Sequence, residues 1–170
     1  MDTPAPNQNL AEGHVAPGYK AQARSNNLIG TKHEAAHPWN VRDLLEKVPH
    51  KASFIDLGSG EGNACAIAQS MGFSPVVGYE IDPLLVAMSW MLHPKLKFVH
   101  GNARDFTPLR WDSTVFMFNP FGRETMEHIE RNCRRPGMHV AYLNSVHADL
   151  FDNWRVVYAG HKRHLFVWGV

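Results

Sequence analysis

Short apolar segments alternate with amphipathic ones between residues 53 and 144, and this alternation constrains the fold more than any other feature of the chain. The apolar segments are continuous, as in "TVFMF" at 114–118. Continuous apolar strands are buried on both faces, which requires a parallel sheet covered by helices on both sides. The sequence therefore predicts an α/β fold built on a doubly wound, mostly parallel sheet.

The predicted elements follow one another in a regular order. A helix begins at Pro38 and ends at Pro49, because proline opens a helix well and cannot continue one. Further helices are predicted at 63–71, 83–92 and 124–134, and strands at 53–57, 75–80, 96–100, 114–119 and 139–144. Two last strands, 154–158 and 164–170, are separated by Gly160-His161-Lys162 with no helix between them. They predict a C-terminal antiparallel hairpin.

Length and composition indicate one domain. A chain of 170 residues with 44% hydrophobic content fits a single globular unit, which we place at 39–170. Residues 1–38 are polar, rich in Pro, Asn, Gly and Ala, and show no sustained period. We interpret them as a polar N-terminal arm and a candidate lid.

Charge and cysteine content exclude several classes of partner. Lys and Arg (17) nearly cancel Asp and Glu (16), so the net charge of +1 predicts neither nucleic-acid nor membrane binding. Cys65 and Cys133 each fall in a predicted helix, which favours two reduced thiols and a cytoplasmic protein. No segment approaches 18 apolar residues, and the N-terminus lacks a signal-peptide core. The oligomeric state is left open.

A glycine-rich turn, "FIDLGSGEGNA" at 54–64, follows the first predicted strand. A phosphate-binding P-loop needs Lys and then Ser or Thr after its last glycine, but Asn63 and Ala64 stand there. A dinucleotide site expects G-x-G-x-x-G, which the G-x-G-x-G spacing here matches poorly. S-adenosylmethionine has an ammonium, a carboxylate and a ribose but no phosphate. A carboxylate such as Asp56 beside glycines that admit close approach suits it.

The turn resembles the first motif, D-x-G-x-G-x-G, of the class I S-adenosylmethionine-dependent methyltransferases, which have a Rossmann-like seven-strand fold. The resemblance covers about residues 50 to 145. It implies that S-adenosylmethionine is the cofactor, S-adenosylhomocysteine the product, and the first strand and its turn a cofactor-binding segment. The implied cofactor-binding residues of this segment are Asp56, Gly58, Ser59, Gly60 and Gly62.

The same resemblance implies cofactor contacts after the next two strands. Glu80 ends the second strand 20 positions after the middle glycine of the turn, where an acid accepts the ribose hydroxyls, and Ile81 follows it. "VHGNARDF" at 99–106 resembles the segment that holds the adenine. The family usually has Asp directly after Gly there, whereas this chain has Asn102 and then Ala103. An Asn carbonyl can still accept from the adenine amino group, and Asp105 is the alternative.

The acceptor side is predicted at "FMFNPFG", which ends the fourth strand. Pro120 has no N–H, so backbone carbonyls near it and the Asn119 side chain could hold an amino group. Phe121 could stack on a planar target or a cation. The stretch resembles the Asn-Pro-Pro-aromatic motif of amino-group methyltransferases that act on bases or amides. It lacks the second Pro and has Gly122 after the aromatic residue. Asn119 is predicted to touch the cofactor as well.

"YLNSVH" at 142–147 ends the fifth strand and makes Asn144 and His147 candidates for orienting the acceptor or taking its proton. The whole pattern resembles small bacterial methyltransferase-like proteins of unassigned substrate. The first motif is also similar to that of seven-strand protein lysine methyltransferases, a likeness confined to the cofactor site.

"HEAAH" at 33–37 matches the H-E-x-x-H pattern of zinc enzymes. Pro38 disfavours helix at His37, the flanks are not apolar-periodic, and no third ligand is recognisable. We predict no metal and interpret the match as chance or as a capping interaction.

The predicted function is methyl transfer from S-adenosylmethionine to an amino group of a small molecule or a protein side chain. Three alternatives stay open: an O-methyltransferase, a non-catalytic S-adenosylmethionine-binding partner protein, and a nicotinamide-dependent oxidoreductase. The reaction itself is an in-line displacement that depends on alignment and desolvation of an already reactive donor.

Overall fold

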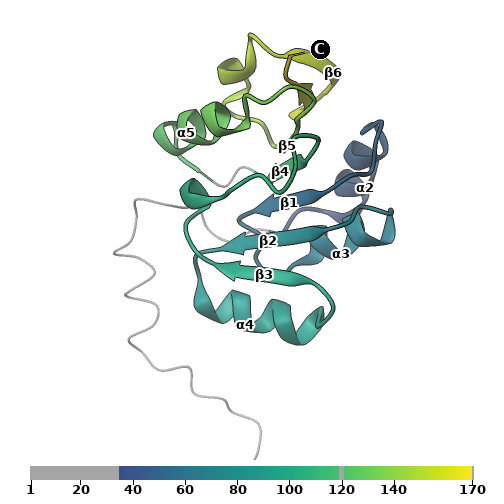
Figure 1. Cartoon of the computed structure of the whole chain (residues 1–170), viewed down its shortest axis with the longest axis vertical. Helices are drawn as coiled ribbons and strands as arrows, with labels where there is room; N and C mark the ends of the chain where they lie inside the picture. The colour runs from purple at the N-terminus through teal and green to yellow at the C-terminus, as the bar shows by residue number, and fades with distance from the viewer. Residues whose placement is uncertain (1–34, 119–120, 170) are drawn as a thin grey trace, which may run out of the picture.

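The structure is a computed structural model that describes residues 35–118 and 121–169. Its centre is a seven-stranded sheet with the order β3-β2-β1-β4-β5-β7-β6 (Figure 1). The strands are β1 (Phe54–Leu57), β2 (Val76–Glu80), β3 (Lys97–His100), β4 (Thr114–Phe118), β5 (His139–Leu143), β6 (Arg155–Gly160) and β7 (Arg163–Val167). The first five pair in parallel, and β7 is antiparallel to both β5 and β6. The predicted fold class and its C-terminal hairpin are confirmed.

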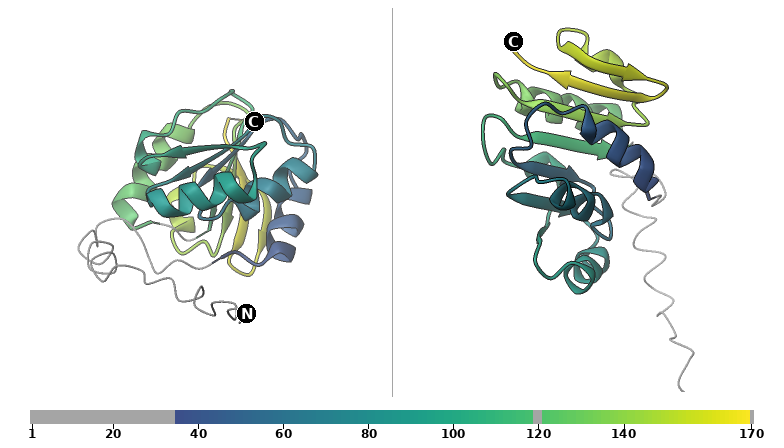
Figure 2. Two further views of the ribbon diagram at one scale, coloured as in Figure 1. Left: turned by 90° about the horizontal axis from the view of Figure 1, so that it is seen from below. Right: turned by 90° about the vertical axis from the view of Figure 1, so that its right-hand side faces the viewer.

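Helices cover both faces of this sheet (Figure 2). The α-helices are α2 (Pro38–Glu46), α3 (Asn63–Ser70), α4 (Pro83–Leu92) and α5 (Arg123–Cys133), and the 3-10 helices are η1 (Ala103–Asp105) and η2 (Ala148–Phe151). One hydrophobic core joins α2, α3 and α4 to one face, and the other joins α5, η1 and η2 to the opposite face. Neighbouring residues of β1 show the alternation, because Phe54 belongs to the first core and Ile55 to the second.

The strand order changes direction at β1, and this change positions the site. β1 pairs with β2 on one side, Leu57 opposite Tyr79, and with β4 on the other, Leu57 opposite Met117. The carboxyl ends of these parallel strands therefore meet at one edge of the sheet. In open α/β sheets the crevice at such a switch point is where ligands bind.

Most predicted bounds agree with the structure to within two residues, but three details differ. β6 extends to Gly160 and β7 ends at Val167, so the hairpin turn is His161-Lys162 rather than three residues long. Lys162 takes the left-handed backbone (φ 51°) that usually favours glycine, and the glycine before it stays in the strand. The 3-10 helices were not predicted. None of the described helices has the length and apolar character needed to cross a bilayer.

Candidate functional site

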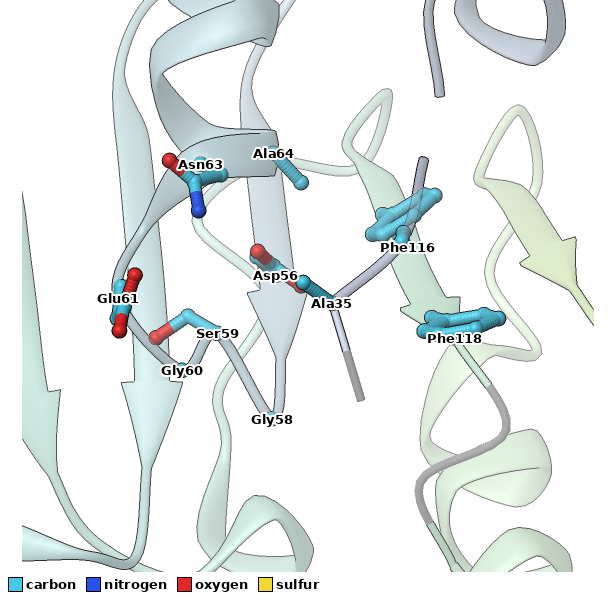
Figure 3. A pocket seen from close by; sticks show the side chains of 11 residues that line it. Ala35, Asp56, Gly58, Ser59, Gly60, Glu61, Asn63, Ala64, Phe116 and Phe118 are labelled. Atoms are coloured by element: carbon cyan, nitrogen blue, oxygen red, sulfur yellow. The ribbon is translucent and has the colours of Figure 1, made fainter. Parts of the chain in front are cut away.

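A pocket opens at the switch point between β1 and β4 (Figure 3). The glycine turn forms one wall, the rings of β4 form another, and Asp56 lies between them. The lining residues are Ala35, Ala36, Asp56, Gly58, Ser59, Gly60, Glu61, Asn63, Ala64, Phe116 and Phe118. Its volume of about 60 Å³ is smaller than the several hundred Å³ of a typical ligand site. The described walls therefore enclose only part of a nucleoside-sized site.

The turn between β1 and α3 is held against β2 by its own backbone. The N–H groups of Gly58 and Ser59 both donate to the carbonyl of Tyr79, at 2.8 and 3.0 Å. Gly60 and Gly62 take left-handed conformations, with φ of 53° and 85°, which only glycine adopts without strain. The sequence pattern thus produces a tight turn whose backbone lines the pocket.

Asp56 projects into the pocket from the third residue of β1. Its side chain is buried, and the Cys65 thiol from α3 donates to Oδ2 at 3.6 Å. Burial raises the pKa of Asp56 from 3.8 to about 7; the thiol hydrogen bond opposes the rise, and the negative charge of Glu80 adds to it. Asp56 therefore exchanges a proton near neutral pH, and a cation placed in the pocket would favour its carboxylate form.

Glu80 lies at the end of β2, and its buried carboxylate is occupied by three backbone donors. Oε2 accepts from the N–H of Gly60 at 2.9 Å, and Oε1 accepts from those of Ile81 and Asp82, each at 2.9 Å. A carboxylate oxygen has about two acceptor positions, so one on Oε2 is left for a ligand. Glu80 thus fastens the glycine turn to β2, a role that sequence analysis missed. Its predicted contact with a ribose stays a prediction.

The predicted adenine segment is built around η1. Asn102 caps this 3-10 helix, and its side-chain carbonyl accepts from the N–H of Arg104 at 2.9 Å. The next residue, Ala103, is buried in the core under the sheet, whereas Ile81 is exposed. Asp105, the alternative, is exposed at the end of η1. None of these residues lines the pocket at β1 and β4.

The structure places only part of the predicted acceptor side. Asn119 and Pro120 lie outside the described residues. Phe121 is only 9% exposed and packs in the core that contains α5, which limits the surface it can offer to a ligand. His147 is half-buried at the start of η2, and Asn144 forms a left-handed turn (φ 52°) after β5. Both lie outside the pocket lining.

Two parts of the pocket were not predicted as site residues. Phe116 and Phe118 come from β4, and their two-residue spacing puts both on the face that carries Asp56, since Asp56 is in register with Phe116. Ala35 and Ala36, which precede α2, form part of the wall as well. The alternation of the strand was a readable signal for the phenylalanines once its neighbour was known. The two alanines had no such signal.

A metal centre has no support within the described residues, where no group of three or more His, Cys, Asp or Glu side chains could hold an ion. His33 and Glu34 of the zinc-like pattern lie outside the described ranges. His37 caps α2, and its Nδ1 accepts from the N–H of Trp39 at 3.3 Å, in agreement with the capping interpretation.

The pocket residues fit S-adenosylmethionine. The Ser59 hydroxyl is buried and has no hydrogen-bond partner within the part of the chain that the structure describes, so a bound polar group would satisfy it. Asp56 offers a carboxylate for the ammonium of the cofactor, and the glycines leave room for close approach. No group in the lining demands a phosphate or a metal instead.

Comparisons with known proteins agree with this geometry, although no protein-family model matches the chain. It is 42% identical over 50 residues to the adenine nucleotide translocase lysine N-methyltransferase of Mus musculus, a match covering 29% of this chain and 21% of the relative. It is 31% identical over 80 residues to a lysine N-methyltransferase of Rattus norvegicus that is named for ATP synthase, covering 46% and 36%. The chain therefore matches well under half the length of either relative.

Among solved structures, the magnesium protoporphyrin IX methyltransferase of Synechocystis PCC 6803 with bound S-adenosylmethionine superposes with a TM-score of 0.60. The alignment covers 91% of this chain and 92% of that one at 12% identity, so the likeness is one of fold. The order of the strands, the glycine turn beside a buried acid and these similarities lead to one conclusion: the chain has the class I S-adenosylmethionine-dependent methyltransferase fold and is distantly homologous to lysine N-methyltransferases.

Proposed function

We propose that this protein is an S-adenosylmethionine-dependent N-methyltransferase whose acceptor is the side-chain amine of a lysine in a protein. The observation that carries the proposal is the pocket at the switch point, where the Asp56 carboxylate, the unpartnered Ser59 hydroxyl and the glycine turn converge. The two relatives that carry lysine N-methyltransferase in their names support the choice of acceptor. A small-molecule amine is the alternative acceptor.

The cofactor would be held from both sides of β1. Asp56 balances its ammonium, Ser59 satisfies its hydroxyl against a polar group, and the remaining acceptor position on Glu80 Oε2 receives a ribose hydroxyl. Asn102 would accept from the adenine amino group through the lone pair that its capping hydrogen bond leaves. When bound, S-adenosylmethionine supplies an electrophilic methyl group on a positively charged sulfur.

The acceptor amine would enter beside β4. Phe118 is half-buried in the pocket wall and offers a ring face to the aliphatic chain or the cationic end of a lysine. Asn119 and Pro120 directly follow it, and we assign their carbonyl groups to orienting the amine. The amine reacts only after losing its proton, for which His147 is our candidate acceptor at the end of β5. The proposal requires no metal.

We further propose that residues 39–170 form the catalytic domain and that the N-terminal arm borders the site. The position of Ala35 and Ala36 in the pocket wall supports this, although most of the arm lies outside the described residues. A cytoplasmic location is proposed as well, because Cys65 and Cys133 are free, buried thiols.

The test is incubation of the full chain with isotope-labelled S-adenosylmethionine and fractionated protein from a cell lysate, followed by mass spectrometry of methylated peptides. Label on lysine is expected. Asp56→Ala should abolish transfer, whereas Asp152→Asn, which changes an exposed acid outside the pocket, should not.

Other results would favour the alternatives. Label on a hydroxyl or carboxyl oxygen would indicate an O-methyltransferase. Calorimetric binding of S-adenosylhomocysteine without transfer to any acceptor would indicate a non-catalytic partner protein, and binding of NADH in its place would indicate an oxidoreductase.

A further inference from the structure

Helix α4 has an unusual composition for a helix at the surface. Its ten residues, PLLVAMSWML, include no charged side chain and a single polar one, Ser89. Only Val86 and Ser89 are buried. Large apolar side chains that remain 42–83% exposed extend along α4 and the residue two positions before it; they are Ile81, Leu84, Met88, Trp90, Met91 and Leu92. We call these six residues the α4 patch.

The α4 patch lies on the outward side of the helix. Leu84, Met88 and Met91 follow the i, i+4, i+7 spacing of one helical face, and Val86 and Ser89 lie on the face toward the sheet. A surface helix normally turns charged and polar residues outward. α4 is at one end of the described molecule, next to the edge strand β3 and far from the β6–β7 hairpin (Figures 1 and 2). No described segment covers its outward face.

The residues that follow α4 are basic. The chain contains no acidic residue from Pro83 to Arg104, and the exposed Lys95 and Lys97 come directly after the helix. Both lysines also line a surface cavity of about 470 Å³ whose walls include no carboxylate. Asp82 is at the opposite end of the helix, where its side chain caps the N-terminus by accepting from Leu84 N–H at 2.9 Å. The patch is therefore apolar along its length and positively charged at one end.

We propose that the α4 patch, together with Lys95 and Lys97, docks on the surface of an anionic lipid bilayer. A helix that lies in a membrane interface buries an apolar face with Leu, Met and Trp, and basic residues beside it attract anionic headgroups. Trp is also favoured at the level of the headgroups. The overall charge of the chain gave no reason to expect a membrane partner, because the acids that cancel these lysines lie elsewhere in the sequence.

A second copy of the chain or a partner protein fits the surface less well. Both need complementary shape over an interface of about 800 Å² per partner, whereas α4 is a single convex helix of ten residues. A partner protein chosen by charge would also need to match cations that are confined to one end of the patch. A bilayer has no shape requirement and accepts both features.

Docking would bring the cofactor edge of the sheet close to the membrane. The patch begins at Ile81, immediately after Glu80 at the carboxyl end of β2, where the glycine turn is fastened. Acceptors at or near the bilayer surface would then be favoured. The inference itself does not depend on the proposed methyl transfer, since it concerns binding alone.

Flotation of the full chain with lipid vesicles tests the proposal. The protein is expected to float with phosphatidylcholine vesicles that contain phosphatidylserine, and more weakly with phosphatidylcholine alone. The double variant Met88→Glu/Met91→Glu should lose at least about tenfold in binding to both. Lys95→Gln/Lys97→Gln should lose about 30-fold on the anionic vesicles only, because each lysine near such a surface contributes about 1 kcal/mol. Val156→Glu is the matched control, since Val156 is an equally exposed apolar residue on the far edge strand.

Calorimetry with S-adenosylhomocysteine checks that every variant stays folded and competent to bind. No flotation of the wild-type protein would overturn the proposal, as would flotation that the Met88→Glu/Met91→Glu variant retains. A wild-type dimer that this variant converts to a monomer, without vesicle binding, would assign the patch to self-association instead.

Discussion

At the scale of single residues, Glu80 connects the architecture of the turn to the binding of a ligand. Its two carboxylate oxygens accept three backbone N–H groups, one from the glycine turn and two from the start of the next segment. Only an ionised carboxylate offers acceptors in both directions, because an amide carries hydrogens on one of its ends. The acid is therefore needed for the fold before any ribose is bound.

Glu80→Gln should for this reason destabilise the protein even without a cofactor. The new NH₂ group must face either the Gly60 N–H or the N–H pair of Ile81 and Asp82, which leaves buried donors unpaired. We expect a loss of about 1–3 kcal/mol in the free energy of unfolding, measured by urea denaturation. Glu124→Gln is the control, because the ion pair of Glu124 with Arg104 is exposed and contributes little. Equal stabilities of the two variants would contradict the fastening role.

At the scale of the elements, the glycine turn determines how α3 packs against the edge of the sheet. Gly62 has a φ of 85°, and a Cβ there would lie 2.5 Å from Cζ of the buried Phe98 on β3. Gly62→Ala should therefore cost roughly 2 kcal/mol or more, through backbone strain together with displacement of the ring. Gly122→Ala should change stability by less than about 0.5 kcal/mol, since its φ is −67° and no atom lies within 4 Å of the new Cβ. Thermal unfolding of both variants measures the difference, and a tolerated Gly62→Ala would show that Phe98 can move aside.

The elements themselves were predictable to a large extent. Continuous apolar runs separated by Gly and Pro determine where strands and helices begin, so the bounds of α4 agree to the residue. The two 3-10 helices were missed because three or four residues carry no detectable period. Within the site, Asp56 and the turn were predicted from their motif. Phe118 was missed because its place beside Asp56 depends on β1 pairing with β4, a long-range contact that spacing along the chain does not reveal.

The α4 patch shows the same limit. Its apolar composition predicted a helix, and a helix that is apolar on all sides is usually buried. Whether a helix is buried depends on how many elements surround it, and α4 packs beside β3 at the end of the sheet, where none follows. Burial at a sheet edge is thus a property of the topology and not of the segment.

At the scale of the whole molecule, Asp56 links pH, ligand binding and stability. Its pKa is raised to about 7 in the folded protein, mainly by burial, from an ordinary value of 3.8. The stabilisation that this group contributes is therefore fully present below about pH 4 and is lost as the pH rises through about 7. Above that pH the ligand-free protein holds a buried carboxylate whose charge is poorly compensated, and the ammonium of S-adenosylhomocysteine would compensate it.

The ligand should consequently stabilise the protein more at pH 8 than at pH 6. With ligand at about 100 times its Kd at pH 8, the gain is about 2.7 kcal/mol, or roughly 5–10 °C in Tm. At pH 6 only about a tenth of the molecules have Asp56 ionised, so the affinity falls about tenfold and the Tm gain by about half. Differential scanning calorimetry at both pH values measures this, and Asp56→Asn separates Asp56 from the histidines that titrate in the same range. The variant should have a higher ligand-free Tm than the wild type at pH 8, and any ligand-induced shift that it retains should not depend on pH. Equal shifts in the wild type at pH 6 and pH 8 would mean that the ammonium binds elsewhere, because no other group described in the pocket joins burial to a proton exchanged near neutral pH.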